Sequence, residues 1–197
     1  MTEDVSSIQP EVQRRLGRCL LRLQQYELLL KAIVAHHELE GPADKLESLQ
    51  AEKVAKQTKQ TLGGLVTQLT GSFLSVRRPE RHNDDVAGPN ADVGLVGWIS
   101  FRTKIEMPEV EHARLVRELG ELVQMRNELV HHFIERFDVW TLVGCTQALE
   151  YLLSSYEVID RHYASLASWA KAMENGRALT SSFLNSESFE AVLMGKL

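Results

Sequence analysis

The chain has 197 residues, of which 44% are hydrophobic and 25% are charged, as in an ordinary globular protein with one sizeable core. Its formal net charge of -5 argues against a protein that coats nucleic acid through bulk positive charge, so nucleic-acid chemistry has to be local. The two cysteines, Cys19 and Cys145, fall within helical apolar patterns and are interpreted as reduced core thiols. With no secretory leader pattern and no long apolar run, we expect a cytoplasmic protein with no membrane partner.

The first predicted helix runs from about Glu11 to His37, after Pro10, and Gly41-Pro42 is expected to close it. Its apolar stripe at helical spacing consists of Leu16, Cys19, Leu20, Leu23, Tyr26, Leu30, Ile33 and Val34. Four arginines lie mostly beside the stripe, which favours a solvated face over an RNA track. They are Arg14, Arg15, Arg18 and Arg22.

A second helix is predicted from about Ala43 to Thr70, with a kink or an early end at Gly63-Gly64 because paired glycines weaken a helix interior. The helical pattern then stops in an inserted loop at about residues 76–94, which is either functional or without fixed structure. From Trp98 to Ile105 apolar and polar residues alternate as in a half-buried strand. Its expected partner is Ser72 to Arg77, which would make an inserted β-hairpin or loop around residues 72–106.

The central helix is predicted to begin at Pro108, and Asp138 is expected to cap the helix that follows, from about Val139 to Met173. That last helix should end at Asn175-Gly176. An amphipathic tail at about residues 180–197, centred on Ser186 to Met194, completes the chain. The sequence therefore predicts a single all-α domain over residues 1–197, an up-and-down bundle of four to five helices.

The central helix carries a cation where its apolar pattern needs a hydrophobic residue. Arg126 interrupts a stripe made of Leu115, Leu119, Leu122, Leu129, Phe133 and Phe137. A buried, unpaired guanidinium is costly, so Arg126 has to find an anion, a solvent-filled crevice or a partner surface. In a regular helix His131 lies about 140° from Arg126 and about 40° from Asn127, so we expect Asn127 to orient the His131 ring. Glu128 stands in the same relation to His132.

Arg126, Asn127 and His131 resemble the R-x4-6-H signature of HEPN domains, all-helical proteins of bacterial toxin–antitoxin and phage-defence systems. The resemblance covers the central helix and, in outline, its neighbours. It implies a metal-independent endoribonuclease without a cofactor, acting as a homodimer on an RNA substrate. Arg126 would stabilise the phosphate, His131 would carry a proton and Asn127 would orient it. His132 also satisfies the spacing and stays an alternative to His131.

Three other interpretations remain open at this stage. The arginine and histidines can be purely structural, the domain can be a non-catalytic HEPN-like binding or assembly module, or the site can hold zinc. Zinc is disfavoured because adjacent histidines point to different sides of a helix and no cysteine lies nearby. Its candidate ligands are His82, His112, His131 and His132.

The densest positive segment in the chain is a candidate RNA contact, with a solvated loop and strand edge as an equally good interpretation. It comprises Arg77, Arg78, Arg81, Arg102 and Lys104. The resemblance also implies control by an antitoxin from a neighbouring gene. One HEPN branch has R-x4-H-x-Y and is silenced by adenylylation of the tyrosine. Phe133 occupies that position here, so we expect a bound protein, rather than modification at this position, to block the site.

Overall fold

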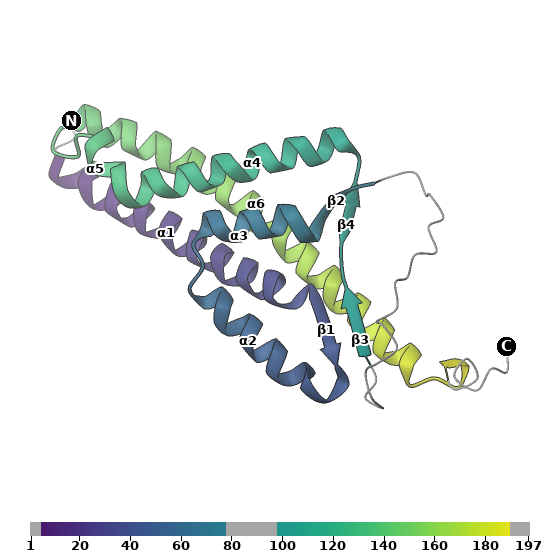
Figure 1. The fold of residues 1–197 in the computed structure, drawn as a ribbon. Helices are drawn as coiled ribbons and strands as arrows, with labels where there is room; N and C mark the ends of the chain where they lie inside the picture. Colours follow the sequence, from purple (N-terminus) through teal and green to yellow (C-terminus); the bar gives the residue numbers. More distant parts are fainter. Residues whose placement is uncertain (1–4, 78–97, 190–197) are drawn as a thin grey trace.

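The computed structural model describes residues 5–77 and 98–189 and confirms an all-α fold with a small β insertion (Figure 1). Three long helices run up, down and up: α1 (Val5–His36), α4 (Glu109–Asn127) and α6 (Leu142–Leu184). Residues near the start of α1 contact residues near the start of α6, and later residues contact later ones. Gln9 hydrogen-bonds the Val139 carbonyl just before α6, and Arg22 pairs with Asp160. These two helices are therefore parallel, and α4 runs against them.

A single hydrophobic core joins these helices to a shorter one, α3 (Leu62–Gln68). The predicted stripe of the first helix is confirmed, with Leu23, Tyr26 and Leu30 almost completely buried. Other fully buried side chains come from α3, α4, α6 and the segments next to them. They are Leu62, Leu65, Leu69, Phe73, Leu119, Leu122, Leu129, Leu152 and Ile159.

The second predicted helix is wrong in its extent, because it is several elements rather than one. A short 3-10 turn (Ala43–Lys45) leads into α2 (Leu46–Thr58), and after a break the chain continues as α3 and a π turn (Leu69–Phe73). The break lies before the paired glycines, where Thr61 caps α3 by accepting a hydrogen bond from the Gly64 amide. A capping side chain thus separates the two helices.

The predicted hairpin is also wrong, because the strands have other partners. Strand β3 (Trp98–Arg102) pairs antiparallel with β1 (Glu38–Pro42), so Gly41-Pro42 ends a strand and not the first helix. Strand β4 (Ile105–Met107) pairs in parallel with β2 (Leu74–Val76). The alternation from Trp98 to Ile105 therefore marks strands but not their pairing. Most of the predicted loop lies outside the described residues.

Helix ends differ from prediction at three places. Helix α1 begins at Val5 and contains Pro10, so it starts before the predicted Glu11. Helix α4 begins at Glu109, directly after Pro108, as predicted. Helix α6 is capped by Thr141, not Asp138, and Gly144 is needed there because a Cβ would collide with the Asp138 carbonyl. Helix α6 continues past its predicted end and takes in the start of the predicted tail. Residues 190–197 of that tail lie outside the described part.

None of the helices in the described residues is long and apolar enough to cross a membrane.

His37, just after α1, is a buried histidine with one unsatisfied nitrogen. Its Nδ1 lies 2.9 Å from the Val34 carbonyl, which fixes the proton on Nδ1, while Nε2 is buried without a hydrogen-bond partner. The ring packs edge-on against Phe73 at 5.9 Å. Burial lowers the pKa of His37 below its usual 6.5, because protonation would place a charge and an unpaired N–H in the core.

This burial predicts a loss of stability in mild acid. Since the pKa of His37 is lower in the folded state, the unfolded chain takes up the proton first, and the free energy of unfolding falls as pH drops below about 6.5. Urea unfolding between about pH 7.5 and about pH 5.5 should show this fall, and His37→Leu should make it shallower. The remainder should come from His162, whose pKa is also lowered by burial. An identical pH dependence in His37→Leu would contradict the assignment.

Candidate functional site

Arg126 lies at the end of α4 and forms an ion pair with Glu27 on α1. Of the three options that the sequence left for Arg126, it has therefore found an anion. Its Nε lies 3.5 Å from a carboxylate oxygen of Glu27, and the two side chains are only 30% and 22% exposed. The stripe around Arg126 is confirmed as core, since Leu122 and Leu129 are buried. A half-buried ion pair thus replaces the missing hydrophobic contact, and the guanidinium keeps one edge toward solvent.

Immediately after Arg126 and Asn127 the helix changes its winding. Residues Glu128–His132 form a π turn, followed by the short helix α5 (Phe133–Arg136). In a π turn the backbone hydrogen bonds join residues five apart, so the residue at i+5 occupies the position beside residue i that i+4 holds in an α-helix. Such turns are rare and are found frequently at functional sites.

The π turn brings Arg126 and His131 together within one chain. Nη1 of Arg126 lies 3.2 Å from Nε2 of His131. The predicted separation of about 140° is therefore wrong, because it assumed regular α-helical winding through residue 131. Neither an unusually extended arginine nor a second copy is needed for this contact.

The hydrogen bond between Arg126 and His131 has a defined direction. A guanidinium nitrogen only donates hydrogen bonds, so Nε2 of His131 accepts and the imidazole is neutral with its proton on Nδ1. Within the described residues, the Nη2 group of Arg126 has no hydrogen-bond acceptor. Arg126 can therefore present N–H groups to an incoming phosphate, and His131 presents a nitrogen lone pair beside it.

Asn127 also contacts this pair, but not in the predicted way. Its Oδ1 accepts a hydrogen bond of 3.3 Å from Nη1 of Arg126. No hydrogen bond joins Asn127 to His131 in the described residues, so the expectation that Asn127 orients the ring is wrong. Asn127 instead orients the guanidinium, and Arg126 orients the histidine.

His132 points to a different neighbour. Its Nδ1 lies 2.8 Å from a carboxylate oxygen of Glu135 on α5, and in the described residues no hydrogen bond joins it to Glu128, its predicted neighbour. Glu128 instead accepts hydrogen bonds from Tyr151 on α6, at 2.8 Å, and from Arg136. The two histidine rings lie edge to face, with centroids 6.3 Å apart, but they have different hydrogen-bond partners. Of the two, His131 is the one that hydrogen-bonds Arg126 in the described residues.

Phe133 completes the apolar stripe after the π turn. It is 5% exposed and its ring centroid lies 5.2 Å from that of Phe137. A phenyl ring at this position is fully explained by core packing.

The candidate RNA-contact residues lie far from the motif. Arg77 follows β2, and Arg102 and Lys104 lie around the end of β3, all at the β end of the molecule. Arg126 lies 17 residues after the first residue of α4, a rise of about 26 Å along the helix. Arg102 is also paired with Glu38 at 3.0 Å. The structure therefore does not bring these residues to the site; two of the set, Arg78 and Arg81, lie outside the described residues.

A metal site at the motif receives no geometric support. Within residues 5–77 and 98–189, no group of three or more His, Cys, Asp or Glu side chains is placed to hold an ion. His82, one of the candidate zinc ligands, lies outside these residues.

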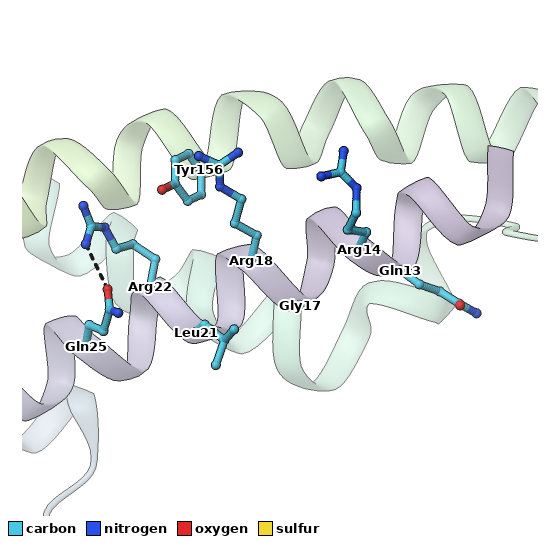
Figure 2. Close-up of a pocket in the computed structure, with 8 residues that line it drawn as sticks. All are labelled: Gln13, Arg14, Gly17, Arg18, Leu21, Arg22, Gln25 and Tyr156. Carbon is cyan, nitrogen blue, oxygen red and sulfur yellow. Dashed lines mark hydrogen bonds between the residues drawn. The ribbon is translucent and has the colours of Figure 1, made fainter.

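The arginines of α1 line a groove of about 510 Å³ against α6, shown in Figure 2. Arg14, Arg18 and Arg22 follow one another at one-turn spacing, and the groove lining contains no carboxylate. Each of these three arginines nevertheless has a partner close by. Arg14 pairs with Glu11, Arg22 pairs with Asp160, and Arg18 stacks on Tyr156 at 4.2 Å. These contacts fit the interpretation of the row as a solvated face.

Sequence reasoning missed three residues around the motif: Glu27, Arg136 and Tyr151. Glu27 sits at the flank of the first apolar stripe, where an acidic residue at the edge of the core was the available signal. Arg136 and Tyr151 have no local signal, since their partnership depends on how α5 and α6 return past the π turn. Searches against protein-family models, curated proteins and solved structures found no match to this chain.

Proposed function

We propose that this protein is a HEPN-type, metal-independent endoribonuclease, acting as a toxin or a phage-defence effector. The observation that carries the proposal is the contact between Arg126 and His131, which pairs a cation with a neutral imidazole on a partly exposed surface. The pair lies within the R-x4-H spacing that resembles the HEPN signature. The π turn that makes the contact is a local departure from regular structure of the kind that functional sites retain.

The chemistry proposed is attack by the RNA 2′-OH on the adjacent phosphate. The free Nη2 group of Arg126 binds a phosphate oxygen, and the phosphate competes with His131 for Nη1. Once released, Nε2 of His131 takes the proton from the 2′-oxygen, which forms a bond to phosphorus while the bond to the leaving 5′-oxygen breaks. Arg126 stabilises the charge that develops on the phosphate. A second proton carrier must then protonate the leaving oxygen.

A cleavage assay tests this proposal directly. Purified protein should cut single-stranded RNA in EDTA and leave 2′,3′-cyclic phosphate ends, since attack by the 2′-oxygen produces that ring. The same sequence with deoxyribose at the cleaved position should resist. Cleavage of the deoxy substrate, or no cleavage of any RNA, would contradict the proposed mechanism.

We also propose that the active form is a homodimer. One copy places one histidine against Arg126, whereas the reaction needs two proton carriers, so a second copy is the simplest source of the other. Large apolar side chains are exposed just past the motif, including Ile134 at 74% and Trp140 at 75%. A second copy of this chain, packing its own motif end there, would cover them.

Ile134→Arg should break this dimer. The side chain is exposed in one copy, so the fold should tolerate arginine, whereas an interface centred there should not. Sedimentation at micromolar concentration should change from dimer to monomer, with cleavage lost in parallel. Val110→Arg is the matched control, because Val110 is 81% exposed at the opposite end of α4. A wild-type monomer that cleaves RNA would overturn the proposed dimer.

The second candidate function is a HEPN-like module that only binds or assembles. The ion pair between Arg126 and Glu27 favours it, since that contact by itself accounts for an arginine in the apolar stripe. Under either proposal an antitoxin or another partner protein would be recovered with the chain after co-expression of the neighbouring gene. An unmodified mass for the peptide around Phe133 would agree with blocking by a bound protein.

A further inference from the structure

The π turn is tied to both helices that follow it through one carboxylate. Glu128 is its first residue, and its Oε2 accepts a hydrogen bond of 2.8 Å from the Tyr151 hydroxyl on α6. The same oxygen accepts a hydrogen bond from Nη1 of Arg136, the last residue of α5. Glu128, Arg136 and Tyr151 thus form a clamp that spans the π turn from its beginning to four residues past its end.

The side chains of the clamp pack against aromatic rings. The Tyr151 ring lies 5.2 Å from Phe137, and the Arg136 guanidinium stacks over Tyr151 at 4.4 Å. Phe137 packs in turn on Phe133, which is buried in the core. Burial, followed by the neighbouring carboxylate, raises the pKa of Tyr151, so its hydroxyl remains a donor. The partners of Glu128 are therefore held by packing as well as by hydrogen bonds.

The site needs such a support because a π turn competes with ordinary helix. If residues 128–132 wound as an α-helix, His131 would stand about 140° from Arg126 and the contact would be lost. The two windings are alternative states of one short segment, and contacts made only in the π form shift the balance toward it. Glu128 makes its contacts to α5 and α6 in that form.

We propose that Tyr151 and Arg136 are positioning residues: by holding Glu128 they fix the π turn and keep His131 beside Arg126. The inference rests on the proposed function for its catalytic consequence. The geometric consequence is measurable in the free protein without any substrate.

Tyr151→Phe tests the clamp by removing one hydroxyl and keeping the ring that packs on Phe137. In the free protein, nitrogen NMR of the histidine side chains should show His131 losing the signature of an Nε2 that accepts a hydrogen bond. In the cleavage assay kcat should fall by about 10²-fold, as expected for misplaced reacting groups, with KM little changed. Glu128→Gln loses the charge that holds Arg136 but keeps an acceptor oxygen for Tyr151. It should therefore change the His131 resonances and kcat less than Tyr151→Phe does.

Tyr156→Phe is the matched control, since Tyr156 lies five residues farther along α6 and its ring contacts Arg18 instead. It should leave the His131 resonances and kcat unchanged. Wild-type His131 resonances in Tyr151→Phe would overturn the clamp. If those resonances do shift but the wild-type protein cleaves no RNA, the clamp stands and the proposed nuclease function fails.

Discussion

Replacing Arg126 with alanine should reduce RNA cleavage by about 10²- to 10³-fold, the usual consequence of removing one charged or hydrogen-bonding group that stabilises a transition state. The variant loses the phosphate contact and also the donor that orients His131 at 3.2 Å. Initial rates under EDTA measure the effect, and circular dichroism should show that the helical content is unchanged.

Two further variants distinguish a role in phosphate binding from a structural role of Arg126. Arg117→Ala removes an exposed arginine from the same helix and should be silent. Arg126→Lys keeps the charge that pairs with Glu27 but not the planar fork, so it should keep stability and recover only part of the activity. Full cleavage in Arg126→Ala would refute the mechanism, whatever its stability.

His131→Ala should lower kcat by about 10²- to 10⁴-fold, the range that general acid–base catalysis contributes. His132→Ala should have a much smaller effect, because the His132 ring is held by Glu135 and has no hydrogen bond to Arg126 in the part of the chain that the structure describes. The two adjacent histidines are both exposed, so each variant controls for general effects of removing an imidazole at this turn. The pH profile of kcat should lose its proton-accepting limb only in His131→Ala.

The opposite outcome has a clear meaning. If His132→Ala abolishes cleavage and His131→Ala does not, then the contact seen in one copy is not the catalytic arrangement. The proton carrier would then have to be reached across the dimer, where the x5 spacing from Arg126 also fits the HEPN-like signature.

Periodicity predicted the parts of this fold that depend on local burial. The stripes that contain Leu23, Leu30 and Leu122 became core because each buried side chain repeats on one helical face. The same reasoning missed the break at Thr61 and the pairing of β1 with β3. A cap is one hydrogen bond that competes with helix continuation, and strand pairing depends on segments about sixty residues apart, so neither follows from a local pattern.

The candidate site shows the same division. One residue at the wrong position in a stripe predicted that Arg126 has to find an anion, a solvent-filled crevice or a partner surface, and the ion pair with Glu27 is the first of these. The predicted angle between Arg126 and His131 was wrong because the prediction assumed a constant turn of about 100° per residue. The packing of Tyr151 and Arg136 around Glu128 accompanies the wider turn, and the contact with Tyr151 depends on how α6 folds back onto it.

The wider turn also changes what an insertion or a deletion would do to this chain. A π turn holds about one residue more than the α-helical turn it replaces, so one residue between Glu128 and His132 can be lost without interrupting the helix. The residues after the deletion would keep their helical phase, because the residue at i+4 in an α-helix occupies the place that i+5 holds in the π turn. The helix would survive, and the histidine, now four residues after Arg126, would still stand beside it. Four intervening residues in a π turn and three in a regular α-helix therefore place a histidine on the same side of the arginine, so this spacing can change by one residue without a substitution of either side chain.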